Sequence, residues 1–347
     1  MIVKTSIYEL IKELNNPEIL LVSLNDCHSY CDVDQCVIDF VDIKKELLIF
    51  EYSYNYSRCF NEYDLQDKLN SYNFKSNWIL TTSNFEFFQS QSNIIYYPTH
   101  AIDFLNCELN QINIDIESHR NFYVGHLTHH LHDHRVISLL QMSNRYWFDK
   151  CLVNFKTDFR SNIEKIIFDQ TYEKLNNDEK RYFDKIVNKL PLVSDYNDYS
   201  ETEPVDSLHS INNKGFLDTY INLFTESNYN LEYITEKSLK PFYCGQFTAV
   251  LGAPGLLEHI EKLGLDTFKE IINIDPLPHL YHRESHEVLN DLRDKLNVIF
   301  DQIELIIPVI NDIWNETYIR RKQNYDLIVS GDIKQKLESS LKIRVGI

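Results

Sequence analysis

A short stretch in the second half of the chain combines the charged and hydroxyl side chains that suit a diphosphate and a sugar. Residues 226–237 read Glu-Ser-Asn-Tyr-Asn-Leu-Glu-Tyr-Ile-Thr-Glu-Lys, so that a threonine, an acid and a lysine stand just before a predicted helix. Helix N-terminal N–H groups and a lysine suit a diphosphate, whereas carboxylates suit sugar hydroxyls. These residue types predict a nucleotide site between Glu226 and Lys237.

Two predicted strands frame this stretch. Tyr220–Phe224 and Phe247–Leu251 are short, mainly apolar segments, which are typical of buried strands of a parallel sheet. A Gly-Ala-Pro-Gly turn follows the second run at 252–255. A strand, a polar loop that closes on a helix N-terminus, and a second strand with a glycine-rich turn together predict an α/β nucleotide site.

The stretch closely resembles the nucleotide-sugar signature of the α-1,3-fucosyltransferase family, in which a Glu-containing strand end is followed by a Tyr-(Ile/Val)-Thr-Glu-Lys box. The resemblance assigns donor binding to Glu226, Ser227, Tyr233, Thr235, Glu236 and Lys237. Ser227 departs from the family, which usually carries asparagine there. The likeness covers residues 125–268. It implies an inverting glycosyltransferase of GT-B fold, that is, two Rossmann-like αβα domains with an intervening cleft. Such an enzyme takes a nucleotide-diphosphate sugar as co-substrate and needs no cofactor or metal.

A run of histidines precedes a predicted helix over Val136–Tyr146. Residues 129–135 read His-His-Leu-His-Asp-His-Arg, which are residue types found in metal sites. The metallo-hydrolase pattern His-x-His-x-Asp-His fails because Leu131 stands at its second histidine, and His130 and His134 satisfy only part of a zinc-helix pattern. The resemblance instead implies that Arg135, at the helix start, contacts the donor diphosphate. A solvated loop and a metal site are the alternatives.

Glycosyl transfer also needs a base for the acceptor hydroxyl, and the resemblance implies a carboxylate of the first domain. Asp26 and Asp103 are the candidates; a turn or cap role for Asp26 and a surface role for Asp103 are the alternatives. Asp32-Val-Asp34 has the form of a metal motif, but such a pair arises readily by chance among 52 acids. The seven scattered cysteines match no zinc or iron–sulfur spacing and are predicted to be reduced thiols.

The order of elements predicts two α/β domains. Short apolar runs bounded by polar residues predict strands at Ile19–Leu24, Cys36–Val41, Leu47–Tyr52, Trp78–Thr82 and Ile94–Tyr97. A weakly patterned polar segment at 108–120 predicts a linker. We therefore expect an acceptor-side domain over residues 1–117 and a nucleotide-sugar-binding domain over 118–347. Further strands are predicted at Asn121–Leu127 and Cys151–Phe155.

A long amphipathic helix is predicted over Leu289–Ile313. Its apolar positions step alternately by four and three residues, at Leu292, Leu296, Ile299, Ile303, Ile306, Ile310 and Ile313. Pro308 is expected to kink this helix. Packing within its own chain is the favoured interpretation, and a coiled-coil dimer is the alternative, so both a monomer and a homodimer stay open.

Composition limits the partners. A net charge of −18 disfavours a protein that coats nucleic acid, because affinity for phosphate backbones comes mainly from lysine and arginine. The acceptor is left open between a glycan, a protein and a phage-type modified DNA base, the last suggested by a composition typical of AT-rich genomes. No apolar run approaches the ~20 residues of a membrane span, so a cytoplasmic protein is expected. The alternative is a binding or regulatory protein that keeps a nucleotide-sugar site but has lost catalytic activity.

Overall fold

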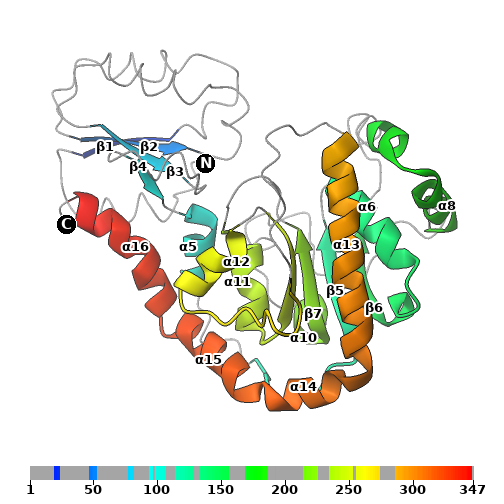
Figure 1. The fold of residues 1–347 in the computed structure, drawn as a ribbon. Helices are drawn as coiled ribbons and strands as arrows, with labels where there is room; N and C mark the ends of the chain where they lie inside the picture. The colour runs from blue at the N-terminus through cyan, green and yellow to red at the C-terminus, as the bar shows by residue number, and fades with distance from the viewer. Residues whose placement is uncertain are drawn as a thin grey trace. The chain divides into compact units, whose positions relative to one another are not determined.

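The structure is a computed structural model that describes residues 19–23, 47–52, 77–81, 94–96, 98–106, 114–128, 133–155, 169–186, 192, 214–225, 234–252, 255–273 and 286–345. The chain divides into two compact units (Figure 1). The first unit consists of Met1–Cys107, Leu231–Thr235 and Gly331–Ile347, and the second of Glu108–Asn230 and Glu236–Ser330. Each unit contains a four-stranded parallel sheet, so the predicted α/β class is confirmed.

The sheet of the first unit has its strands in sequence order. These are β1 (Ile19–Ser23), β2 (Leu47–Tyr52), β3 (Asn77–Thr81) and β4 (Ile94–Tyr96). Helix α5 (Thr99–Leu105) follows β4, and the last helix of the chain, α16 (Asp332–Val345), packs against both. Four of the five predicted strands are confirmed, and the fifth, Cys36–Val41, lies outside the described residues.

The sheet of the second unit has a different strand order. It contains β5 (Phe122–Thr128), β6 (Cys151–Phe155), β7 (Thr219–Thr225) and β8 (Phe247–Leu251), arranged as β6-β5-β7-β8. Every residue of β7 and β8 is buried, which confirms that these apolar runs are strands covered on both faces. From β5 the chain moves first to β6 on one side and then to β7 on the other.

The second unit also contains helices, some packed on its sheet and others on neighbouring helices. They are α6 (Asp133–Ser143), η4 (Phe148–Lys150), a helix over 169–174, α8 (Asn177–Ile186), α10 (Lys214–Leu217), α11 (Glu236–Tyr243), α12 (Leu256–Lys262), α13 (His286–Ile306), η6 (Ile307–Val309), α14 (Ile310–Glu316) and α15 (Tyr318–Val329). The β5–β6 and β7–β8 crossovers run in opposite directions along the sheet. Right-handed connections therefore place α6 and α11 on opposite faces, as Figure 1 shows. Helix α6 packs against α13 and α8, and α11 against β7, β8 and α15.

The long amphipathic helix packs within its own unit. Leu292, Leu296, Ile299, Ile303 and Ile310 are buried in the core that includes residues of β5, β7 and α6. The seam that a coiled-coil partner would need is thus already covered. At Pro308 the helix breaks into the 3₁₀ turn η6, because proline lacks the N–H that would continue the α-helical ladder. The predicted intramolecular packing and the kink are both confirmed.

The compact units differ from the predicted division at residue 117. Residues 108–117 cluster with the second unit, whereas the chain returns to the first unit at 231–235 and again from Gly331 onward. Packing explains the final return, since Ile333 and Leu337 are buried on α16, which contacts β4 and α5. A hydrophobic pattern in α16 predicts that it is buried, but it does not say against which sheet.

Buried arginines and aromatic rings join α14 and α15 to the amino ends of β7 and β8. The Arg321 guanidinium lies 3.4 Å from the centroid of the Trp314 ring and donates to the carbonyl oxygens of Ile116 and Trp314. Phe247 and Tyr220 meet Trp314 edge to face. Burial lowers the pKa of Arg321 to about 9. These contacts lie at the edge opposite to the carboxyl ends of the strands, and they are structural.

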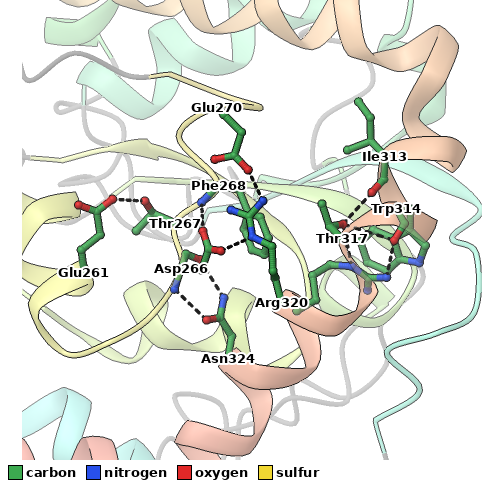
Figure 2. Close-up of polar contacts among 11 residues, drawn as sticks. Glu261, Asp266, Thr267, Phe268, Glu270, Ile313, Trp314, Thr317, Arg320 and Asn324 are labelled. Carbon is green, nitrogen blue, oxygen red and sulfur yellow. Dashed lines mark hydrogen bonds and ion pairs between the residues drawn. The ribbon is translucent and has the colours of Figure 1, made fainter.

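A second network fixes the turn after α12 (Figure 2). Phe268 adopts a φ of 55°, in the left-handed region that costs ordinary residues about 1–2 kcal/mol. The Asp266 carboxylate accepts the Phe268 N–H at 3.0 Å and also accepts Arg320 Nε. Asn324 donates to the Asp266 carbonyl and accepts the Asp266 N–H, each at 2.8 Å. The network holds the strained turn against α15.

A buried ion pair joins α8 to α13. Arg293 donates to the two oxygens of the Glu179 carboxylate, at 2.7 and 2.8 Å, in a bidentate geometry. Glu179 also accepts the Asn176 N–H, while its own N–H donates to the Asn176 side chain, each at 2.9 Å. Asn176 and Glu179 thus form a capping box that begins α8. One carboxylate starts a helix and neutralises a buried cation from a segment over a hundred residues away.

Candidate active site

The carboxyl ends of β5 and β7 form the candidate site. These strands are neighbours at the centre of the second sheet, and the chain leaves them in opposite directions. In open parallel sheets, ligands bind beyond the carboxyl ends of the strands at this kind of switch point. Helix α6 begins after β5 and α11 begins after β7, so the two charged segments singled out in the sequence both start helices here (Figure 1).

Arg135 joins the start of α6 to the end of β7. It is the third residue of α6, its Nε donates to Thr225 Oγ1 at 3.0 Å, and its Nη2 donates to the Thr225 carbonyl oxygen at 3.3 Å. The residue is 3% exposed. The structure therefore brings Arg135 to the end of β7, directly before Glu226. The buried guanidinium holds that strand end in place.

His126 lies beside Arg135, and sequence reasoning did not select it. Its Nδ1 lies 3.0 Å from the Leu223 carbonyl oxygen, so Nδ1 carries the proton. The buried Nε2 has no hydrogen-bond partner among the described residues. Burial, aided by the Arg135 charge, lowers the pKa of His126 to about 4. The signal in the sequence was a histidine inside the strand predicted at Asn121–Leu127, because burial of such a strand favours the neutral imidazole.

Glu236 and Lys237 form the first turn of α11. The Lys237 Nζ lies 3.1 Å from Glu236 Oε1. The lysine side chain is 34% exposed and the glutamate side chain 6%, so the carboxylate is buried and the ammonium reaches solvent. Thr235 directly precedes the helix, in the N-cap position that threonine favours, and is buried. This geometry lets Glu236 orient Lys237 toward an anion.

Lys240 lies one helical turn beyond Lys237, a spacing that by itself suggests a position further out from the site. The structure instead buries Lys240, which is 5% exposed, with Nζ 5.7 Å from the centroid of the Phe216 ring. Because α11 packs on β7, β8 and α15, most of its surface faces the core.

Several candidate residues lie outside the described part of the chain. These are Asp26, Glu226, Ser227, Tyr233, the Asp32–Asp34 pair and His129, His130 and His132. Asp103 is described only as a backbone position within α5 of the first unit. The structure therefore joins Arg135 to the end of β7 and pairs Glu236 with Lys237. The side chains of the two proposed bases, Asp26 and Asp103, are not described.

The described part of the histidine run is engaged in packing. The Asp133 carboxylate accepts Thr171 Oγ1 at 2.6 Å and forms an ion pair with Lys174 at 2.7 Å, and His134 is buried. Asp133 thus ties the start of α6 to the helix over 169–174. Within the described ranges, no group of three or more His, Cys, Asp or Glu side chains is arranged to hold a metal ion.

Comparisons of the chain with models of protein families, with curated proteins and with solved structures gave no match. Among the helices that the structure describes, none is both long and apolar enough to cross a membrane. The functional assignment therefore depends on the sequence motif and the geometry of the site.

The depressed pKa of His126 predicts acid lability. An unfolded histidine titrates near 6.5 and the folded one at about 4, so its stabilisation is complete above pH 6.5 and is lost as the pH falls toward 4. His126→Asn retains a donor for the Leu223 carbonyl and removes the titration. When the pH falls from 7.5 to 4.5, the unfolding free energy of both proteins should decrease. We expect the decrease to be about 2–3 kcal/mol smaller in the variant than in the parent, as measured by urea denaturation. Equal losses would contradict the assignment.

His259 is the control for this measurement. Burial, aided by the Lys262 charge, lowers its pKa to about 4 as well, so part of the acid lability remains in the His126→Asn variant. His259→Asn should remove that part independently, because the two residues share no described contact. The titration is reported by the change in unfolding free energy between pH 7.5 and pH 4.5, and not by the unfolding free energy at either pH alone.

Proposed function

We propose that the chain is a glycosyltransferase that moves a sugar from a nucleotide-diphosphate donor to an acceptor hydroxyl, with inversion and without a metal. One observation supports this above all: the two cationic segments, at Arg135 and Lys237, begin the helices that follow the adjacent central strands β5 and β7. That is where parallel α/β sheets bind diphosphates. The proposal includes the GT-B arrangement of two Rossmann-like domains.

The chemistry assigns a role to each charged group. As the bond between the anomeric carbon and the diphosphate oxygen breaks, its electron pair passes to the leaving diphosphate. Lys237 stabilises this developing charge, and Glu236 fixes the position of the ammonium. Arg135 holds the end of β7, from which the Glu226 segment departs, and adds positive charge near the diphosphate. The acceptor oxygen attacks the opposite face of the sugar, and its proton passes to the carboxylate of Asp26 or Asp103.

The remaining donor-box residues have binding roles in this proposal. Glu226, Ser227 and Tyr233 contact the sugar or the nucleotide, and Thr235 caps α11 so that its N–H groups point to the diphosphate. The acceptor is a glycan or a phage-type modified DNA base. The charge of −18 favours the glycan, because DNA brings a polyanion to an acidic protein.

A catalytically decayed nucleotide-sugar-binding protein is the second candidate. Two observations favour it: Arg135 is 3% exposed and donates to Thr225, and Ser227 replaces the asparagine that is usual in the family. A decayed site would bind a nucleotide sugar without cleaving it. Binding and turnover therefore have to be measured separately.

Release of nucleotide diphosphate from a panel of nucleotide sugars tests the proposal. We expect purified protein to hydrolyse one donor slowly with water as acceptor, and to retain this activity in EDTA, because lysine and helix N-terminal charges neutralise the diphosphate. Thermal shift measurements on the same panel report binding. Activity that disappears in EDTA and returns with Mn²⁺ would contradict the metal-independent mechanism. A donor that binds without being cleaved, even with glycan acceptors present, would identify a decayed protein.

A further inference from the structure

A groove of about 660 Å³ lies on the second unit between the C-terminal part of α6, the start of α8 and α13. It is distinct from the candidate active site, because Arg135 begins α6 whereas Asn144 follows its end, roughly 13 Å further along the helix axis. The described residues that line the groove are polar or aromatic, and none of them has an aliphatic side chain. Such a lining suits a hydrated, polar ligand.

The charges of this groove are largely neutralised within the protein. Three of its four lining acids are in ion pairs with arginine, namely Glu179 with Arg293 at 2.7 Å, Asp178 with Arg181 at 2.7 Å and Glu304 with Arg145 at 3.2 Å. The acids outnumber the two lining arginines, which disfavours a polyanion. Three of the acids are also already paired with guanidinium groups, which disfavours a cationic peptide. A neutral ligand fits this balance best.

The groups left for a ligand are amides, a carboxylate and tyrosine rings. The Asn176 side-chain oxygen accepts the Glu179 N–H at 2.9 Å, and the Asn297 oxygen accepts Arg145 Nη2 at 3.1 Å. Each asparagine oxygen thus accepts a hydrogen bond within the protein, which fixes the orientation of the amide. The NH₂ group of each asparagine is then the group that can donate to a ligand. Tyr146, at 69% exposed, supplies an aromatic surface at the groove.

We propose that this groove binds a neutral saccharide. Asn176 and Asn297 donate to sugar hydroxyls, the Asp294 carboxylate accepts from them, and the Tyr146 ring packs against the apolar face of a pyranose. The capping box and the bidentate Glu179–Arg293 pair hold the wall rigid, which lowers the entropy lost on binding. The inference goes beyond the proposed glycosyl transfer and does not rest on it, since saccharide binding here needs no donor.

Binding of the full chain to an array of neutral and charged glycans, followed by titration calorimetry with the best neutral one, tests this inference. We expect Tyr146→Ala to weaken binding about tenfold, and Ile319→Ala, an equally exposed apolar residue on α15, to leave it unchanged. Asn144→Ala, on the groove wall, should weaken binding less than Tyr146→Ala. Because Tyr146 is largely exposed, its variant should fold normally.

Two comparisons separate this site from the active site. Lys237→Ala should leave glycan affinity intact, and Tyr146→Ala should leave donor hydrolysis by water intact. The inference is overturned if no neutral glycan binds, if binding is unchanged in Tyr146→Ala, or if oligolysine displaces the glycan more strongly than a neutral competitor does. If glycan binding is lost in Lys237→Ala but not in Tyr146→Ala, the saccharide occupies the active site and the groove is not its site.

Discussion

Replacement of Lys237 with alanine is expected to lower donor turnover by ~10²–10³-fold, equivalent to about 3–4 kcal/mol of transition-state stabilisation. The loss should appear mainly in kcat, because the ammonium stabilises charge that develops as the diphosphate leaves. The fold should survive, since the Lys237 side chain is 34% exposed and its ion pair with Glu236 joins two neighbours in the sequence. Release of nucleotide diphosphate measures turnover, and circular dichroism measures the fold.

The controls for this variant follow from the structure. Lys240 is unsuitable because it is buried, whereas Lys185 on α8 is exposed, so Lys185→Ala should keep full activity. Lys237→Arg should restore part of the rate, because a planar guanidinium does not replace a compact ammonium in a fitted site. If Lys237→Ala retains near-normal turnover, the donor-box interpretation is wrong, and the glycosyltransferase proposal loses its main support.

The largest expected loss of stability comes from the pair between Glu179 and Arg293. Arg293→Met keeps much of the side-chain volume but leaves a buried carboxylate without its cation, which typically costs about 3–5 kcal/mol. Both partners are buried, and Arg293 also donates to the Lys174 carbonyl at 3.0 Å, so that contact is lost as well. Chemical denaturation should show this loss as a lower free energy of unfolding.

A matched control lies on the same helix. Asp178 and Arg181 also form a 2.7 Å pair, but their side chains are 66% and 64% exposed. Arg181→Met should therefore cost less than about 1 kcal/mol, because solvent screens an exposed pair. Adding Glu179→Gln to Arg293→Met should recover part of the stability, since a neutral amide is less costly to bury than an unpaired carboxylate. If Arg293→Met and Arg181→Met lowered the unfolding free energy equally, burial would not explain the strength of the Glu179–Arg293 pair.

Local patterns in the sequence predicted the local structure. The mainly apolar segments that became β7 and β8 are buried along their whole length, as is usual for inner strands of a parallel sheet. The alternation of three and four residues gave α13, and Pro308 gave the break that follows it. The helix predicted after Lys237 begins slightly earlier, at Glu236, so Glu236 and Lys237 belong to its first turn. Each of these features depends on side chains within one or two turns of the same segment.

Only the tertiary structure decided which distant segments meet. It placed Arg135 on Thr225, joined Arg293 to Glu179, buried Lys240 and left the His126 Nε2 enclosed beside Arg135. It also assigned α16 to the first unit, although α16 is the last helix of the chain. Hydrophobic periodicity specifies which face of an element is buried but not its partner, which depends on strand order and on packing between residues far apart in sequence. The sequence therefore determined the elements and the donor-site hypothesis, and the pairing of strands β5 and β7 brought Arg135, which follows β5, to the end of β7.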